Sequence, residues 1–236
     1  MLTGDFQVAA AEDNESGNSA DFQASEKSDQ GLDNKQTGLY TSAMRRKRET
    51  SEPRQRILET ADRLFYQEGV RAVGIDRIIA EAGVAKMSLY KHFPSKDDLI
   101  LAVLKYREES VLGFFRSAME RHSKKSKNPL RAFFAALKDF FESPGFRGCP
   151  FQNAAVELAD PTHPGTEFVR GHKQRFSEFL RGLVEETVGK AAAKAAPAVT
   201  ILVEGAIMTA VIQGNPGAAD VARDAALKLV GHEKGV

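Results

Sequence analysis

A glycine between two short helical periods constrains the fold of this chain more than any other feature. Ile75, Ile78 and Ile79 recur at helical spacing, and a second helical period follows soon afterwards. Gly83 stands between the two, where a left-handed residue lets one helix end and the next begin at a sharp angle. Two short helices joined in this way form a helix-turn-helix. The sequence therefore predicts that motif over residues 75–92.

Helices are also predicted on both sides of the motif. Upstream, apolar residues recur every three or four positions from Pro53 to Gly69, which indicates an amphipathic helix of about four turns. Downstream, Ser95 is suited to cap a long helix that opens with charged residues and continues through Leu99 and Ile100. These helices complete a small N-terminal domain and lead out of it.

The remainder of the chain keeps a helical pattern. Proline or glycine bounds each expected helix, as is usual for helix ends, and these segments are 129–142, 150–158, 164–189, 197–213 and 218–230. We expect an all-α fold in which a three-helix N-terminal domain is joined by a long helix to a C-terminal helical domain. The expected divisions are a disordered acidic tail with a basic arm at its end (1–44), the helix-turn-helix domain (45–97) and the C-terminal domain (98–236).

Charge is distributed unevenly along the chain, although the net charge is only +1. Residues 1–43 hold eight acidic residues and two lysines, whereas residues 45–96 hold twelve basic and seven acidic residues, including an Arg-Arg-Lys-Arg run at 45–48. A basic segment confined to one folded stretch is typical of a nucleic-acid module, and a solvated basic surface is the alternative. The helix-turn-helix favours DNA as the partner.

The second helix of the motif has the composition of a recognition helix. Leu89 and Phe93 lie four residues apart and are expected to pack inward. The remaining side chains form a polar outer surface, on which lysines and a tyrosine hydroxyl match phosphate oxygens while Lys86 and Ser88 have the reach for base edges.

The run from Gly83 to Leu99, Gly-Val-Ala-Lys-Met-Ser-Leu-Tyr-Lys-His-Phe-Pro-Ser-Lys-Asp-Asp-Leu, resembles the signature of the TetR family of regulators. The resemblance includes Ile57-Leu58-Glu59-Thr60-Ala61 upstream, and it is strong over residues 53–104. It implies an all-helical homodimer that binds double-stranded DNA and holds a small effector in its C-terminal domain. By motif position the DNA contacts would be Lys86, Ser88, Tyr90, Lys91, His92 and Lys96. Base preference is not transferred, because this chain has Met87-Ser88 where the family often has Gly-Thr.

Two features of the C-terminal half bear on that expectation. Small residues on the helices at 197–213 and 218–230, such as Gly205, would let two copies pack as a four-helix interface. An effector site would lie among the middle helices, and the candidates to line it are Phe133, Phe140, Phe151, Asn153, Glu157, His172 and Phe176. Phenylalanines at helical spacing are also the usual content of a protein core.

Other functions have weaker support in the sequence. Cys149 is the single cysteine. Its thiol would have a function if it sensed oxidants or electrophiles. The alternative is that Cys149 is a small buried residue at the start of a helix. Cys149 with His163 or His172 lacks the flanking motif of an enzyme and the paired spacing of a zinc site. A protein-binding helical adaptor would not explain the basic recognition segment. We expect no enzyme activity, no cofactor and no metal, no membrane segment, and a cytoplasmic location.

Overall fold

The computed structural model describes residues 52–232, and its helices begin and end close to the proline, glycine and cap positions. In chain order they are α2 (Pro53–Glu68), α3 (Ile75–Ala82), α4 (Lys86–His92), α5 (Lys96–Ser123), α6 (Pro129–Phe141), α7 (Pro150–Leu158), α8 (Pro164–Val188), the 3₁₀ helix η1 (Lys190–Ala195), α9 (Ala196–Gln213) and α10 (Ala218–His232). Residues 52–232 contain no strand, which confirms the all-α expectation. The expected acidic tail and the basic run at 45–48 lie outside the described residues.

The three N-terminal helices form one unit around a small apolar core. Ile57, Leu64, Ile78 and Leu89 have no exposed surface, so α2, α3 and α4 each contribute to this core. Gly83 has a φ of 63°, in the left-handed region, and it ends α3 so that α4 can begin three residues later. The helix-turn-helix predicted from the sequence is therefore confirmed.

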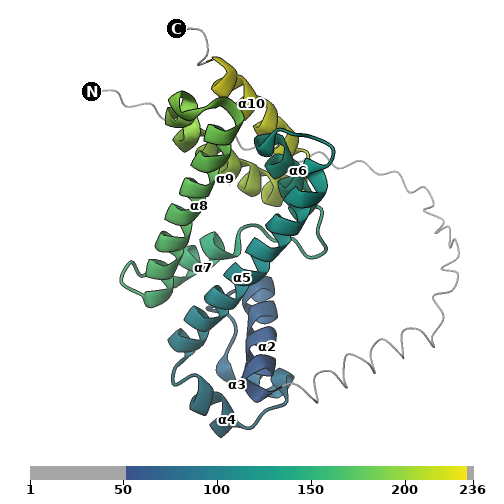
Figure 1. The fold of residues 1–236 in the computed structure, drawn as a ribbon. Coiled ribbons are helices and arrows are strands. Elements are labelled where there is room, and N and C mark those ends of the chain that lie inside the picture. The colour runs from purple at the N-terminus through teal and green to yellow at the C-terminus, as the bar shows by residue number, and fades with distance from the viewer. Residues whose placement is uncertain (1–51, 233–236) are drawn as a thin grey trace, which may run out of the picture. The chain divides into compact units, whose positions relative to one another are not determined.

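α5 connects the two domains. Its first turn is closed by a capping box, in which Ser95 Oγ accepts a hydrogen bond from Asp98 N at 3.0 Å and Asp98 Oδ2 accepts one from Ser95 N at 3.1 Å. From that cap the helix packs against α2 at one end and against α6 and α8 further along (Figure 1). The long connecting helix is as predicted.

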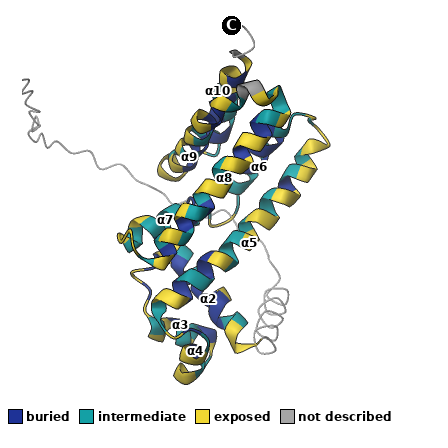
Figure 2. Ribbon diagram, turned by 60° about the vertical axis from the view of Figure 1, so that its left-hand side comes forward, coloured by how far each residue is buried: buried dark blue, intermediate teal, exposed yellow. Residues whose placement is uncertain are grey.

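The C-terminal domain is built from α6 to α10 together with the second half of α5. Phe133, Phe134 and Leu137 on α6 are almost completely buried, and α10 packs between α6 and α9. Figure 2 shows the buried residues concentrated on the surfaces where these helices face one another. The short helix η1 between α8 and α9 was not expected from the sequence.

One helix of the C-terminal domain carries apolar residues on two of its sides. By length and composition, residues Ala193–Gln213 would be able to cross a membrane, with a mean hydropathy of 1.9 over the most apolar window, of which 39% is buried. This corrects the expectation that no segment would meet that criterion. α9 packs against α8 and α10, and its buried side carries Val199, Val203 and Ala206. Its composition is thus that of a core helix with a second apolar side.

Candidate DNA-reading face and ligand cavity

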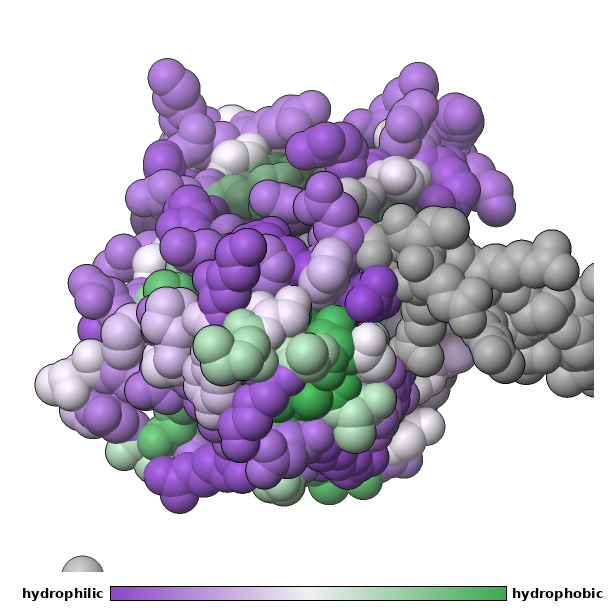
Figure 3. Space-filling model, turned by 90° about the horizontal axis from the view of Figure 1, so that it is seen from below, coloured by the Kyte–Doolittle hydropathy of each residue, from purple (hydrophilic) through white to green (hydrophobic). Residues whose placement is uncertain are grey.

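One side of α4 projects away from the protein. We call Lys86, Met87, Tyr90 and Lys91 the reading face, because all four are exposed while the opposite side of the helix packs on the core. Met87 is 80% exposed and Tyr90 40% exposed. Figure 3 views this end of the molecule, where hydrophilic residues surround a smaller apolar area. Two cations, a phenol and a thioether on one surface provide groups for phosphates and for base edges.

The other three predicted DNA contacts are less accessible. Ser88 and His92 on α4 are half-buried, as is Lys96 at the start of α5. Burial lowers the pKa of Lys96, and the carboxylates of Asp97 and Glu157 offset part of that effect. These positions lie beside the reading face, and their contact with DNA stays a prediction.

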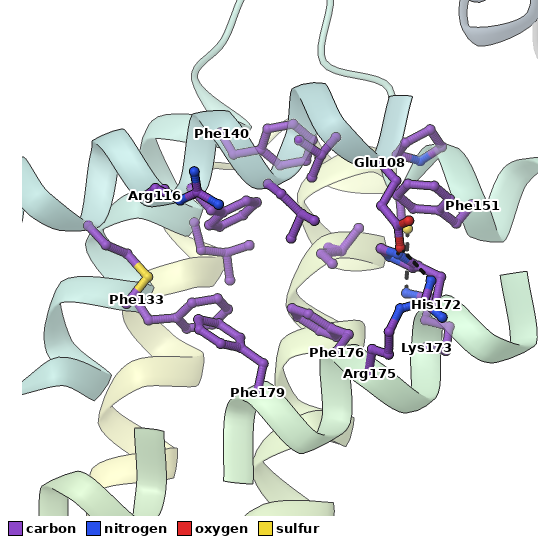
Figure 4. Close-up of a pocket in the computed structure, with 18 residues that line it drawn as sticks. Glu108, Arg116, Phe133, Phe140, Phe151, His172, Lys173, Arg175, Phe176 and Phe179 are labelled. Atoms are coloured by element: carbon purple, nitrogen blue, oxygen red, sulfur yellow. Dashed lines mark hydrogen bonds and ion pairs between the residues drawn. The ribbon is translucent and has the colours of Figure 1, made fainter. Parts of the chain in front are cut away.

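A cavity of about 520 Å³ lies in the C-terminal domain, bounded chiefly by α5, α6, α7 and α8 (Figure 4). Its lining is mainly apolar and aromatic, with a few charged groups, as in pockets that hold small organic molecules. The lining residues are Glu108, Val111, Leu112, Phe115, Arg116, Met119, Phe133, Leu137, Phe140, Cys149, Pro150, Phe151, His172, Lys173, Arg175, Phe176, Phe179 and Ile207.

Five of the seven effector candidates named from the sequence line this cavity: Phe133, Phe140, Phe151, His172 and Phe176. Several of them contact one another. The ring of Phe151 stacks on the imidazole of His172 with centroids 3.7 Å apart, and Phe133 lies 6.2 Å from Phe176. The sequence therefore identified much of the aromatic wall.

Asn153 and Glu157 do not line the cavity, which corrects their assignment. Asn153 Nδ2 donates to Arg147 O at 2.9 Å, and Glu157 Oε2 accepts from Arg71 N at 3.3 Å. The cause is helical geometry: on α7, positions two and six residues after Phe151 are rotated by about 200° and 240° from it. Glu157 therefore contacts the N-terminal domain, and Asn153 contacts the loop before α7; both lie beside a smaller hollow that Tyr66 and Val70 also line.

A cluster of charged side chains occupies one side of the cavity. Glu108 Oε1 accepts from His172 Nδ1 at 2.8 Å and from Arg175 at 2.6 Å. Lys173 Nζ lies 2.7 Å from Glu204 Oε1 and 3.4 Å from Cys149 Sγ. Figure 4 draws Glu108, His172, Lys173 and Arg175 together, across the cavity from Arg116.

The protonation states in this cluster follow from burial and pairing. Burial opposes ionisation of Glu108, but the hydrogen bonds from Arg175 and His172 hold its pKa below the ordinary value. Burial lowers the pKa of His172, although Glu108 acts in the other direction. The lowered pKa of His172 favours the neutral imidazole at neutral pH, and the tautomer with a proton on Nδ1 can donate to the carboxylate of Glu108.

Charged lining residues from α5 and α8 were missed from the sequence: Glu108, Arg116, Lys173 and Arg175. On a long amphipathic helix they read as ordinary surface charges. A signal was present, because Glu108, Phe115 and Arg116 belong to a series of α5 positions at three- and four-residue spacing that all line the cavity.

The segment from Arg147 to Leu158 contacts both the cavity and the N-terminal domain. Before α7, Tyr66 Oη on α2 donates to Gly148 O at 3.0 Å and accepts from Arg147 N at 2.8 Å. At the end of α7, Arg71 donates to Leu158 O at 3.1 Å. α7 is therefore held at both ends by the domain that carries the reading face.

A second exposed surface lies on the last two helices. We call it the outer face, and it consists of Ile201, Met208 and Ile212 on α9 with Val221 and Leu229 on α10, which are 72%, 48%, 75%, 72% and 36% exposed. Large apolar side chains gathered on one surface mark a contact site for another molecule. No group of three or more potential metal ligands occurs in the described part of the chain.

A recognition helix on a three-helix unit, followed by a separate helical domain with an apolar cavity, defines a helix-turn-helix DNA-binding regulator. Comparison with known proteins agrees. The model of bacterial regulatory proteins of the tetR family matches residues 57–103, and that of the tetracyclin repressor-like C-terminal domain matches residues 127–226.

Solved structures and curated relatives give the same result. A TetR-family transcriptional regulator from Streptomyces coelicolor, SCO4454, is 36% identical with a TM-score of 0.63, over 77% of this chain and 93% of that one. The Bacillus subtilis regulator YxaF is 29% identical over 66% of this chain and 83% of its own length. The activator FasR of Mycolicibacterium smegmatis is 39% identical, but the match spans only 41% of this chain and 44% of FasR. The chain belongs to the TetR family of transcriptional regulators, which are not enzymes.

Proposed function

We propose that the protein is a ligand-responsive repressor that binds a palindromic operator as a homodimer in the cytoplasm and releases it when a small molecule fills the cavity. One observation carries this proposal. Cys149, Pro150 and Phe151 line the cavity, while the same segment contacts α2 through Gly148 and the α2–α3 connection through Glu157. A ligand that displaces Phe151 would therefore act on the helix-turn-helix domain directly.

The outer face supports the homodimer. α9 is apolar on both sides, so one side fills the core and the other needs a partner, and the exposed Gly205 lets a second helix approach closely. A two-fold axis through this face pairs α9 and α10 with their symmetry mates in a four-helix interface.

Symmetry and spacing then determine how DNA is bound. Two recognition helices enter successive major grooves when they lie about 34 Å apart, and the operator has the same two-fold symmetry as the protein. A ligand weakens binding only if it favours a conformation with another spacing, through its different affinities for the two states.

Repression is proposed over activation because it is the common outcome in the family, although FasR is named an activator. The alternative of redox sensing through Cys149 has no support from the comparisons.

The proposal is tested by selecting fragments of the source genome with purified protein and sequencing the recovered duplexes. We expect an enriched palindromic site, bound by two chains per duplex as measured by analytical ultracentrifugation. Enrichment of an asymmetric site bound by a single chain would contradict the homodimer. If no site is enriched, the proposal that the protein binds an operator is contradicted.

A further inference from the structure

The lining of the cavity carries more positive than negative formal charge. Arg116, Lys173 and Arg175 contribute three cations, and Glu108 contributes one anion. Glu204 pairs with Lys173 from outside the lining, and Glu108 pairs with Arg175. One arginine, Arg116, is left over.

Arg116 is exposed, and its guanidinium has no ion pair or hydrogen bond within residues 52–232. It lies on the more open side of the cavity, where Leu112 and Phe179 are 52% and 43% exposed. A guanidinium beside exposed apolar groups can accept an anion without moving that anion out of water, so the desolvation penalty of a buried charge is avoided.

The apolar wall between the two polar regions sets the length of the ligand. Glu108 and Arg116 are eight residues apart on α5, which is about 12 Å along the helix axis. Phe115 stacks on Phe133 with centroids 5.7 Å apart, and Phe133 lies 6.0 Å from Phe179, so that aromatic rings line the wall near Arg116. Figure 4 shows Phe133 and Phe179 at the same end of the cavity as Arg116, with Phe176 between them and the charged cluster.

We propose that the natural ligand is an apolar anion: an elongated molecule whose aromatic or hydrocarbon body lies among the phenylalanines and whose anionic group pairs with Arg116. This inference rests on the proposed ligand response, since it names the chemical class that the cavity takes. The far end of the ligand is uncharged, because the cluster there is already paired.

A cationic ligand fits the cavity less well. The only carboxylate in the lining, Glu108, already accepts from His172 and Arg175, and a ligand cation placed beside it would face Arg175 and Lys173. Like charges at such distances repel most strongly where water is excluded.

The test uses two dyes that share one apolar body. Anilinonaphthalene sulfonate carries an anionic sulfonate, and phenylnaphthylamine has the same rings without it. Both fluoresce when transferred to an apolar site, and the chain contains no tryptophan to interfere. Titration of each dye into the full-length protein gives its Kd, and Arg116→Gln is compared with wild type.

We expect Arg116→Gln to weaken the sulfonate dye by up to about fivefold, the range of an exposed charge pair, and to leave the neutral dye unchanged. Lys105→Gln is the matched control, because Lys105 is an exposed cation on the same helix that does not line the cavity. Equal weakening of both dyes, or equal effects of the two variants on the sulfonate dye, would overturn the anion assignment.

A second variant checks that the dyes occupy the cavity. Leu112→Tyr adds bulk at the open side without introducing a tryptophan, and because Leu112 is 52% exposed we expect the fold to tolerate it. We expect this variant to bind both dyes more weakly. Unchanged binding of both dyes would contradict the claim that the anion binds in the cavity. These titrations contain no DNA, so their failure is distinguishable from a failure of ligand-controlled operator release, which is measured separately.

Discussion

Tyr66 on α2 and Gly148 before α7 are joined by a hydrogen bond of 3.0 Å from the phenol to the glycine carbonyl. The phenol oxygen of Tyr66 also accepts a hydrogen bond from Arg147 N at 2.8 Å. The guanidinium of Arg107 lies 4.7 Å from the centre of the tyrosine ring. Cys149, the next residue, lines the cavity. One side chain of the DNA-binding domain therefore holds the loop at the edge of the ligand site.

Tyr66→Phe removes both of these hydrogen bonds and leaves the ring in place. We expect the free energy of unfolding to fall by about 1 kcal/mol, since the carbonyl of the buried Gly148 loses its donor and the amide of the exposed Arg147 loses its acceptor. Urea unfolding measures this change. Hydrogen exchange of the Arg147 amide supplies a local readout, and its protection should fall. The control is Tyr90→Phe, whose phenol is on the reading face. Unchanged protection at Arg147 would contradict the contact.

His172 should make stability depend on pH. Burial holds its folded pKa below the unfolded value of 6.5, so below pH 6.5 the unfolded chain binds a proton that the folded chain does not. Stability is complete above pH 6.5 and is lost as the pH falls toward the lower folded pKa. The stability that Glu108 supplies is present above its unfolded pKa of 4.5 and is lost only as the pH falls below that value.

Urea unfolding between about pH 5 and 7 isolates the histidine contribution. His172→Asn keeps a donor for Glu108 but does not titrate, so its unfolding free energy should change less over this interval than that of wild type. A parallel pH dependence of the two proteins would show that His172 is not responsible.

Met87 should contribute to base preference. It is 80% exposed on the reading face, and a thioether of this kind matches the methyl group of thymine in the major groove. We expect Met87→Ala to reduce selectivity at one position of each half-site by about fivefold, measured by repeating the site selection with the variant. Val156→Ala, which truncates an exposed apolar residue on α7, is the control. An identical selected site for Met87→Ala would contradict the prediction.

The outer face should be required for the dimer. Ile212→Glu places a charge where two copies of α9 are proposed to meet, and burial of that charge without a partner is unfavourable by several kcal/mol. Sedimentation should then show a monomer that keeps its helical content. Val156→Glu makes the same change at a residue that is 78% exposed outside this face, and it should remain dimeric. A dimeric Ile212→Glu protein would place the interface elsewhere.

The helix boundaries were predictable because local residues determine them. Gly83 ends α3 in a left-handed conformation, and Ser95 with Asp98 closes the first turn of α5. Prolines begin α6, α7 and α8. Each of these signals acts within one turn of the chain. Local chemistry is therefore enough for the secondary structure and for the reading helix.

The cavity was only partly predictable because it depends on how helices are rotated against one another. Phe151 and Glu157 lie on the same short helix, yet one faces the cavity and the other accepts from the backbone of Arg71. In the sequence Arg116 is indistinguishable from an ordinary surface charge. Only the packing of α8 beside α5 shows that Arg116 lines the cavity. Packing between segments that are distant in the sequence determines which residues line the cavity. The periodicity of a single helix carries no information about that packing.

The central claim is that α4 reads DNA, and salt-titrated binding of the selected duplex to Tyr90→Ala and Lys91→Ala tests it most directly. We predict that both variants fold, that each binds at least about tenfold more weakly than wild type, and that Lys91→Ala lowers the slope of log affinity against log salt by about one per half-site. Lys105→Ala serves as the matched control and should bind like wild type. If both α4 variants bind the duplex with wild-type affinity and salt dependence, another surface carries the DNA and the account is contradicted.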